Sequence, residues 1–153
     1  MTARLSSTTN TDNLYERDYY LWLQHTARLI SEGKFSDVDT ANLIEEIEDM
    51  GRSEKRAIES NLRILLLHLL KYKYQSSKIT NSWKSTIREH RKRINKAFKD
   101  SPSLKRYFEE VFDECYQDGR ELAADETGLP LDAFPSESPF TPSETLNPDY
   151  LPA

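Results

Sequence analysis

The sequence predicts an all-α protein, an up-and-down bundle of four to five helices with an extended Pro-rich C-terminal tail packed over it. Residues 58–74 are apolar on more than one side of a helix, which is typical of a helix in the middle of a bundle. Six of the seven prolines follow Gly128, and proline interrupts helices, so residues 129–153 are expected to form the tail.

The first helix is expected to begin near residue 13 and to end at Gly33. Its apolar face is made of Tyr15, Tyr19, Trp22, Thr26 and Leu29. A second helix places its apolar residues on one face: Leu43, Ile47 and Met50. The apolar register continues through Gly51 into residues 58–74, so the sequence leaves open whether one helix is kinked there or two helices are separated.

Two oppositely charged helices follow residues 58–74. The first carries a basic outer face between Lys84 and Lys99. The second is acidic outside and is expected to bury its apolar residues, which are Leu104, Phe108, Val111, Cys115 and Leu122. Ser101 is expected to cap the second of these helices, with Pro102 at its first position. Because only a tight turn joins the two helices, we expect an antiparallel hairpin with complementary charges.

The chain is therefore predicted to contain a disordered leader (residues 1–12), a helical bundle domain (13–128) and a C-terminal strap (129–153). Thr141 and Glu144 match a capping box for one short helical turn in the strap. Five apolar or aromatic residues are spaced as anchors: Phe134, Phe140, Leu146, Tyr150 and Leu151. We therefore expect the strap to cover the bundle, and a partner-docking motif is the alternative.

Charge and cysteine content limit the classes of function. The net charge is −5, which disfavours binding to nucleic acid or an acidic membrane except through a local basic face. The single cysteine, Cys115, excludes an internal disulfide and is typical of a reducing compartment. No apolar leader or span of about 20 residues is present, so we expect a soluble, cytoplasmic protein without membrane association. We expect no cofactor.

Five phrases occur in order: NLIEEIEDMGRSEKRAIESNLRILLLHLLKYKYQ, SWKSTIREHRKRI, SPSL, ETGLPLDAFP and SPFTPSETLNPDYLP. Together, over about residues 14–152, they resemble the uncharacterised, mostly cyanobacterial domain of unknown function family twenty-nine. The resemblance implies a small helical bundle and a cyanobacterial source, and it implies no activity, substrate or catalytic residue. The positions that match the family's phrases include Glu46, Gly51, Ser53, His68, Lys71, Ser82, Trp83, Thr86, Ile87 and Arg91.

His68 is the polar residue in the central apolar segment whose position most needs an explanation. A buried imidazole needs a hydrogen-bond partner, which we expect on the second helix or on the fourth, which is the basic helix that contains Lys84–Lys99. Glu46 and Asp49 put two carboxylates on one helical face, as in helix-bundle metal sites. No histidine has an acid three residues before it, however, so we expect no metal and interpret these carboxylates as a solvated acidic face.

Arg63 and His68 also fit the Arg-x4-6-His spacing of the HEPN helical ribonucleases, and they are the candidate catalytic residues. On a regular helix they point about 140° apart, so they would converge on one phosphate only through a dimer or a distorted backbone. The basic face offers Arg88 and Arg91 to phosphates, and Trp83 could stack on bases.

Two classes of function follow. The leading interpretation is a protein-interaction or adaptor module with an unknown protein partner or a homodimer, because no motif has the pattern of a catalytic site. The alternative is an RNA-binding protein or HEPN-like ribonuclease that uses the Lys84–Lys99 face. The candidate binding residues are Glu46, Asp49, Lys71, Trp83, Arg88 and Arg91.

Overall fold

The computed structural model describes residues 14–153, and every regular element within them is helical, which confirms the all-α prediction. The helices are α2 (Tyr19–Ser31), α3 (Thr40–Tyr74), α4 (Asn81–Asp100), α5 (Leu104–Thr127) and α6 (Pro142–Leu146). Short 3₁₀ turns lie between them at η1 (Phe35–Asp37), η2 (Ser76–Lys78) and η3 (Leu131–Ala133). The predicted leader, residues 1–12, lies outside the described residues.

The chain forms two compact units, one up to Ser53 and the other from Glu54 to Ala153. We call them the N-terminal unit and the C-terminal unit. Helix α3 contributes its first part to the former and the remainder to the latter, and it is continuous through Gly51. The alternative that the sequence left open is thus resolved as one helix of 35 residues.

In the N-terminal unit, residues 14–17 are helical and Asp18 separates them from α2. The Asp18 side chain caps α2 by accepting a hydrogen bond from the Leu21 backbone N–H at 3.0 Å. The buried residues of α2 are Trp22, Thr26 and Leu29. Gly33, at a φ of 72°, follows α2 in the left-handed region that glycine adopts easily, as the sequence predicts.

The first part of α3 does not bury the apolar face that the sequence predicts. Asp39 supports the start of the helix, because its Oδ1 accepts from the Asn42 backbone N–H at 3.3 Å. Ile47 is nevertheless 56% exposed and Met50 is 62% exposed. The helical period identifies residues that share a face, but it does not say whether another element covers that face.

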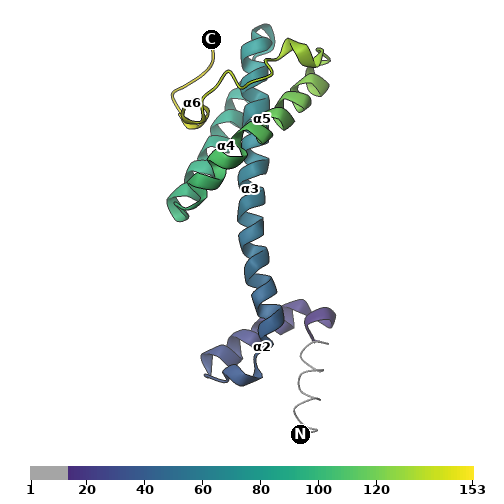
Figure 1. Ribbon diagram of the computed structural model, residues 1–153, viewed down its shortest axis with the longest axis vertical. Helices are drawn as coiled ribbons and strands as arrows, with labels where there is room; N and C mark the ends of the chain where they lie inside the picture. The colour runs from purple at the N-terminus through teal and green to yellow at the C-terminus, as the bar shows by residue number, and fades with distance from the viewer. Residues whose placement is uncertain (1–13) are drawn as a thin grey trace. The chain divides into compact units, whose positions relative to one another are not determined.

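In the C-terminal unit, the rest of α3 is the centre of one core, in agreement with the prediction for residues 58–74. Seven of its side chains are buried, from Ile58 to Leu70. Residues from α4, α5 and the tail complete the cluster, including Ile94, Phe108 and Phe134. Figure 1 shows α4 and α5 beside this part of α3.

Helix α4 is capped by Thr80, whose Oγ1 accepts from the Trp83 backbone N–H at 3.2 Å. Helix α5 begins at Leu104, so the predicted start at Ser101 and Pro102 is wrong: the Leu104 N–H instead closes a turn on the Ser101 carbonyl at 3.0 Å. Leu122 of α5 is 38% exposed and not buried as predicted. A Cβ at Gly119 of α5 would lie 3.2 Å from the Arg63 carbonyl oxygen, so the missing side chain lets α5 approach the α3 backbone closely.

The charges of α4 and α5 do not pair as the sequence predicts. Within the described residues, each helix has an internal ion pair, and the acids of α5 otherwise pair with α3, through Asp118 and Glu126. A net charge on each helix says nothing about which outer faces come within about 4 Å of each other.

The tail packs over the C-terminal unit, as predicted. Phe134 and Phe140 are buried in its core, Leu146 and Tyr150 pack against that core, and Arg120 Nε donates to the Phe134 carbonyl at 3.1 Å. Leu151 is 42% exposed, so the prediction that it is an anchor is wrong, because spacing alone does not determine which side chains reach the core. Helix α6 has the predicted capping box, in which Thr141 and Glu144 each accept from the other's backbone N–H.

Candidate functional site

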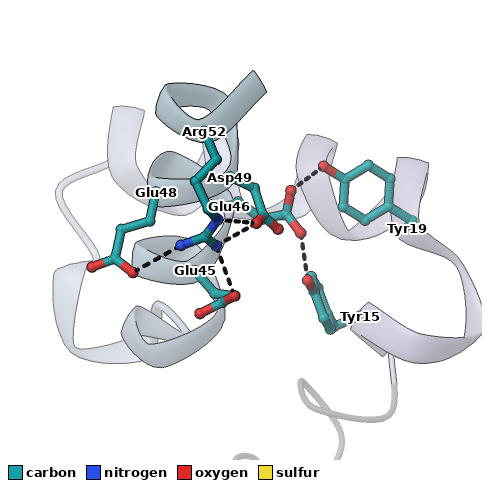
Figure 2. A network of polar contacts seen from close by, with 7 residues as sticks. All are labelled: Tyr15, Tyr19, Glu45, Glu46, Glu48, Asp49 and Arg52. Carbon is teal, nitrogen blue, oxygen red and sulfur yellow. Dashed lines mark hydrogen bonds and ion pairs between the residues drawn. The ribbon is translucent and has the colours of Figure 1, made fainter. Parts of the chain in front are cut away.

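In the N-terminal unit, the predicted binding residue Glu46 lies between two tyrosines (Figure 2). Its carboxylate accepts hydrogen bonds from the hydroxyls of Tyr15 and Tyr19. The hydrogen bond to Glu46 raises the pKa of Tyr15 to about 12. Both tyrosines stay protonated at neutral pH, so the oxygens of Glu46 are engaged within the unit.

Asp49, the second predicted carboxylate, is paired with Arg52 on the next turn of α3. The same guanidinium lies 3.0 Å from Glu45 Oε1 and 3.9 Å from Glu48 Oε2 (Figure 2). These side chains are all about half exposed, so each pair contributes little to stability by itself. One cation therefore partly neutralises three carboxylates.

Metal binding has no grouped ligand set in residues 14–153. No three His, Cys, Asp or Glu side chains within that range are placed to hold one ion. What the acidic cluster forms is a network of hydrogen bonds and ion pairs.

In the C-terminal unit, Lys71 of α3 joins the other two long helices. Its Nζ lies 2.9 Å from Glu126 Oε2 on α5 and 4.6 Å from the centroid of the Trp83 ring on α4. The Lys71 side chain is only 13% exposed, but that of Glu126 is 47% exposed, so water partly screens the ion pair. The structure thus brings together the predicted binding residues Lys71 and Trp83. It adds Glu126, which no local sequence pattern indicates because it lies 55 positions after Lys71.

His68 is only partly buried, and its partner belongs to its own helix. Its Nδ1 lies 2.9 Å from the Ile64 carbonyl oxygen, so the prediction of a partner on another helix is wrong. Burial lowers the pKa of His68, the Ile64 carbonyl opposes this, and Lys71 lowers the pKa further. With Nδ1–H donating to the carbonyl, the neutral ring keeps its Nε2 lone pair available.

Arg63, the other candidate catalytic residue, has different neighbours. Its guanidinium lies 3.6 Å from Asp118 Oδ2 on α5 and 3.5 Å from Ser60 Oγ. Arg63 and His68 therefore each make separate contacts, as their angular separation of about 140° on a helix suggests.

One residue of the predicted basic face of α4 is buried and so does not contribute to that face. Arg88 is exposed, whereas Arg91 is 3% exposed and is turned under the tail. Arg91 Nε donates to the Thr145 carbonyl at 2.8 Å, and its Nη2 donates to the Glu144 carbonyl at 3.3 Å. Arg91 therefore holds the C-terminal end of α6 against α4, and burial lowers its pKa. The sequence showed a run of bases without showing which one the tail would cover.

A hollow of about 650 Å³ lies between α5 and the tail. Glu109, Asp113 and Glu137 give it an acidic rim, and Phe112, Tyr116 and Phe140 contribute to its lining. The sequence predicted a packed C-terminal tail, but it did not indicate a hollow between the tail and α5.

The N-terminal unit exposes many large apolar and aromatic side chains that its own packing does not explain. Exposed large apolar or aromatic side chains gather there: Tyr19, Tyr20, Leu21, Leu23, Ile30, Phe35, Ile44, Ile47 and Met50. These nine are three-quarters of the twelve such residues in the described chain, although the unit is the smaller of the two. We call them the exposed apolar set.

None of the helices described is both long enough and apolar enough to cross a membrane. No curated protein and no solved structure matches the chain significantly. A family model, Domain of unknown function DUF29, matches residues 14–151 and so includes both units. The chain therefore belongs to the DUF29 family.

Proposed function

We propose that this protein is a protein-interaction module that binds its partner through the exposed apolar set of the N-terminal unit. One observation carries the proposal. Of the twenty buried apolar residues within residues 14–153, two belong to the N-terminal unit, Trp22 and Leu29, and eighteen belong to the C-terminal unit. Exposing many large apolar side chains to water is unfavourable, and such exposure is typical of a protein-binding surface.

The two units then have different roles. The C-terminal unit has a core built from three helices and the tail, so it can fold around its own apolar residues. The N-terminal unit keeps most of its large apolar residues outside, and a partner that covered them would stabilise both the unit and the complex.

A nucleic-acid interface on α4 is the second candidate. Seven bases and two acids lie between Asn81 and Asp100, and all of the bases except Arg91 are exposed. Such a face could bind phosphates in an RNA-binding protein or, with Arg63 and His68, in a HEPN-like ribonuclease. It ranks second because the basic face explains none of the apolar exposure in the N-terminal unit.

We also propose that the protein is cytoplasmic and cyanobacterial. Cys115 is its only cysteine, and burial raises the pKa of the thiol to about 12, so the thiol stays protonated. A single buried thiol suits a reducing compartment. The DUF29 resemblance supports the cyanobacterial source.

The test is photocrosslinking in the native host from two exposed apolar or aromatic positions, one in each unit. A photoreactive phenylalanine replaces Tyr20, which is 69% exposed in the N-terminal unit, or Leu131, which is 40% exposed in the C-terminal unit. We expect one discrete protein adduct from position 20, lost in the Ile47→Ser/Met50→Ser variant, and none from position 131. An adduct from position 131 alone would contradict the proposal. So would the absence of any protein adduct if the purified protein instead carries bound RNA that salt removes.

A further inference from the structure

We infer that the occupant of the N-terminal unit is an amphipathic helix of another protein, with basic residues flanking its apolar stripe. The inference rests on the proposed function and adds the chemistry of the partner.

The N-terminal unit carries the whole net charge of the protein. Residues 14–53 contain nine Asp and Glu and four Lys and Arg, which gives −5, the value for the complete chain. The C-terminal unit holds 16 of each kind and is neutral. A partner drawn to the exposed apolar set therefore meets a negative potential, which favours a cationic surface and raises its association rate.

On α3 the acids alternate with the exposed apolar residues. Ile44 and Ile47 are 55% and 56% exposed, and together with Gly51 they lie within about 60° of one another around the helix. Glu45 and Glu48 have side chains that are 57% and 59% exposed. A linear apolar stripe beside carboxylates matches the apolar stripe and basic edge of an amphipathic helix.

Gly51 is also consistent with a partner helix that binds along this stripe. Glycine within a helix costs about 1 kcal/mol relative to alanine, and a Cβ at Gly51 would meet nothing within 4 Å. The folded chain therefore gives no packing reason for this glycine. From Ile44 to Gly51 the stripe spans about 10 Å of helix, and the missing side chain at its end allows the backbone of a partner helix to come close.

A second copy of this chain is a poor occupant. Two N-terminal units placed face to face would bring net charges of −5 together, which opposes association. The basic face of α4 would supply the opposite charge, but the apolar side of α4, including Ile87, Ile94 and Phe98, is buried in its own unit. That face therefore has charge to offer and no apolar stripe.

The test uses the full chain and two synthetic helices of 21 residues with the same leucine stripe. One has lysine at all other positions and the other has glutamate, and binding is followed by fluorescence anisotropy. We expect the lysine helix to bind and the glutamate helix to bind at least tenfold more weakly. The Ile44→Ser/Ile47→Ser variant should weaken lysine-helix binding at least tenfold, and the Glu45→Gln/Glu48→Gln variant should weaken it severalfold at low salt.

The matched control is Glu121→Gln/Leu122→Ser on α5, which changes an exposed acid and an apolar residue in the C-terminal unit and should leave binding unchanged. A loss of binding in this control, or equal binding of both helices, would overturn the inference. Sedimentation that shows a dimer lost in Ile44→Ser/Ile47→Ser would also overturn it, and would leave the proposed interaction function standing. Failure of the crosslinking test from position 20 would instead remove the proposed function itself.

Discussion

The two units use the same helix in opposite ways. From Ile58 to Leu70, α3 has seven buried side chains, whereas no side chain of α3 before Ile58 is buried. The first stretch is supported by the Asp39 cap, by the Arg52 ion pairs and by two tyrosines on Glu46. Half-exposed pairs of this kind are individually weak, so helix formation alone does not show that a stretch has a core.

This difference implies unequal stability. Burial of apolar surface is the main term that offsets conformational entropy, and most of that burial lies in the C-terminal unit. The N-terminal unit should therefore open locally at a lower free energy, which hydrogen exchange resolves residue by residue. The same shortage of burial leaves the N-terminal unit free to gain stability from a partner.

Removal of the tail should have the largest effect, and should be confined to the C-terminal unit. Ending the chain after Gly128 removes the buried Phe134 and Phe140 and the carbonyls that Arg91 binds. Loss of one buried Phe costs about 3–5 kcal/mol, so we expect the unit to lose most or all of its stability. Thermal unfolding followed by circular dichroism measures this, and an unchanged melting curve would show that the tail only lies on the surface.

A matched pair on α3 isolates the contrast between the units. Leu66 is fully buried and Ile47 is 56% exposed, so Leu66→Ala should cost about 2–5 kcal/mol and Ile47→Ala less than about 0.5 kcal/mol. Urea unfolding of both variants gives the two free energies. Similar costs at the two positions would mean that Ile47 is covered in the free protein, and the contrast would fail.

Two glycines provide a smaller test with opposite signs. Gly51→Ala places a Cβ in open space within a helix, so it should stabilise the protein by up to about 1 kcal/mol. Gly119→Ala places a Cβ 3.2 Å from the Arg63 carbonyl oxygen and 3.3 Å from the Leu67 backbone nitrogen, so α3 and α5 must move apart. Crowding of this kind typically costs about 1–3 kcal/mol, more than the gain in helix propensity. Denaturant midpoints that rise in both variants would show that α5 can adjust its packing.

Local patterns in the sequence were sufficient for much of this fold. Apolar side chains around residues 58–74 require cover on several sides, and that requirement alone predicts a central helix. The caps at Thr80 and Thr141 are local as well, because each involves a hydrogen bond across three residues.

The remaining features depend on contacts between distant residues. Ile47 and Met50 have the spacing of a buried face, and only the position of other helices determines that they are exposed. Arg91 looks like its basic neighbours until the tail, more than 50 residues later, supplies carbonyl partners. The contacts of Lys71 with Glu126 and Trp83 depend on how α3, α4 and α5 pack, so no local pattern predicts them. Membership of the DUF29 family does not identify a site either, because the family has no assigned activity.

The smallest of the four effects concerns pH and should again be confined to one unit. Burial lowers the pKa of His68 in the folded protein, so as pH falls below about 6.5 the unfolded chain takes up a proton that the folded chain does not. The contribution of His68 to stability is therefore complete above that pH and decreases as the pH approaches the folded-state pKa. His68→Asn keeps a donor for the Ile64 carbonyl and does not titrate, so its stability should fall less than that of the wild type between pH 7 and pH 5. Hydrogen exchange at both pH values should place the difference in residues 54–153, because His68 packs there. Equal slopes for the two proteins would mean that the ring is solvated well enough to accept its proton without cost.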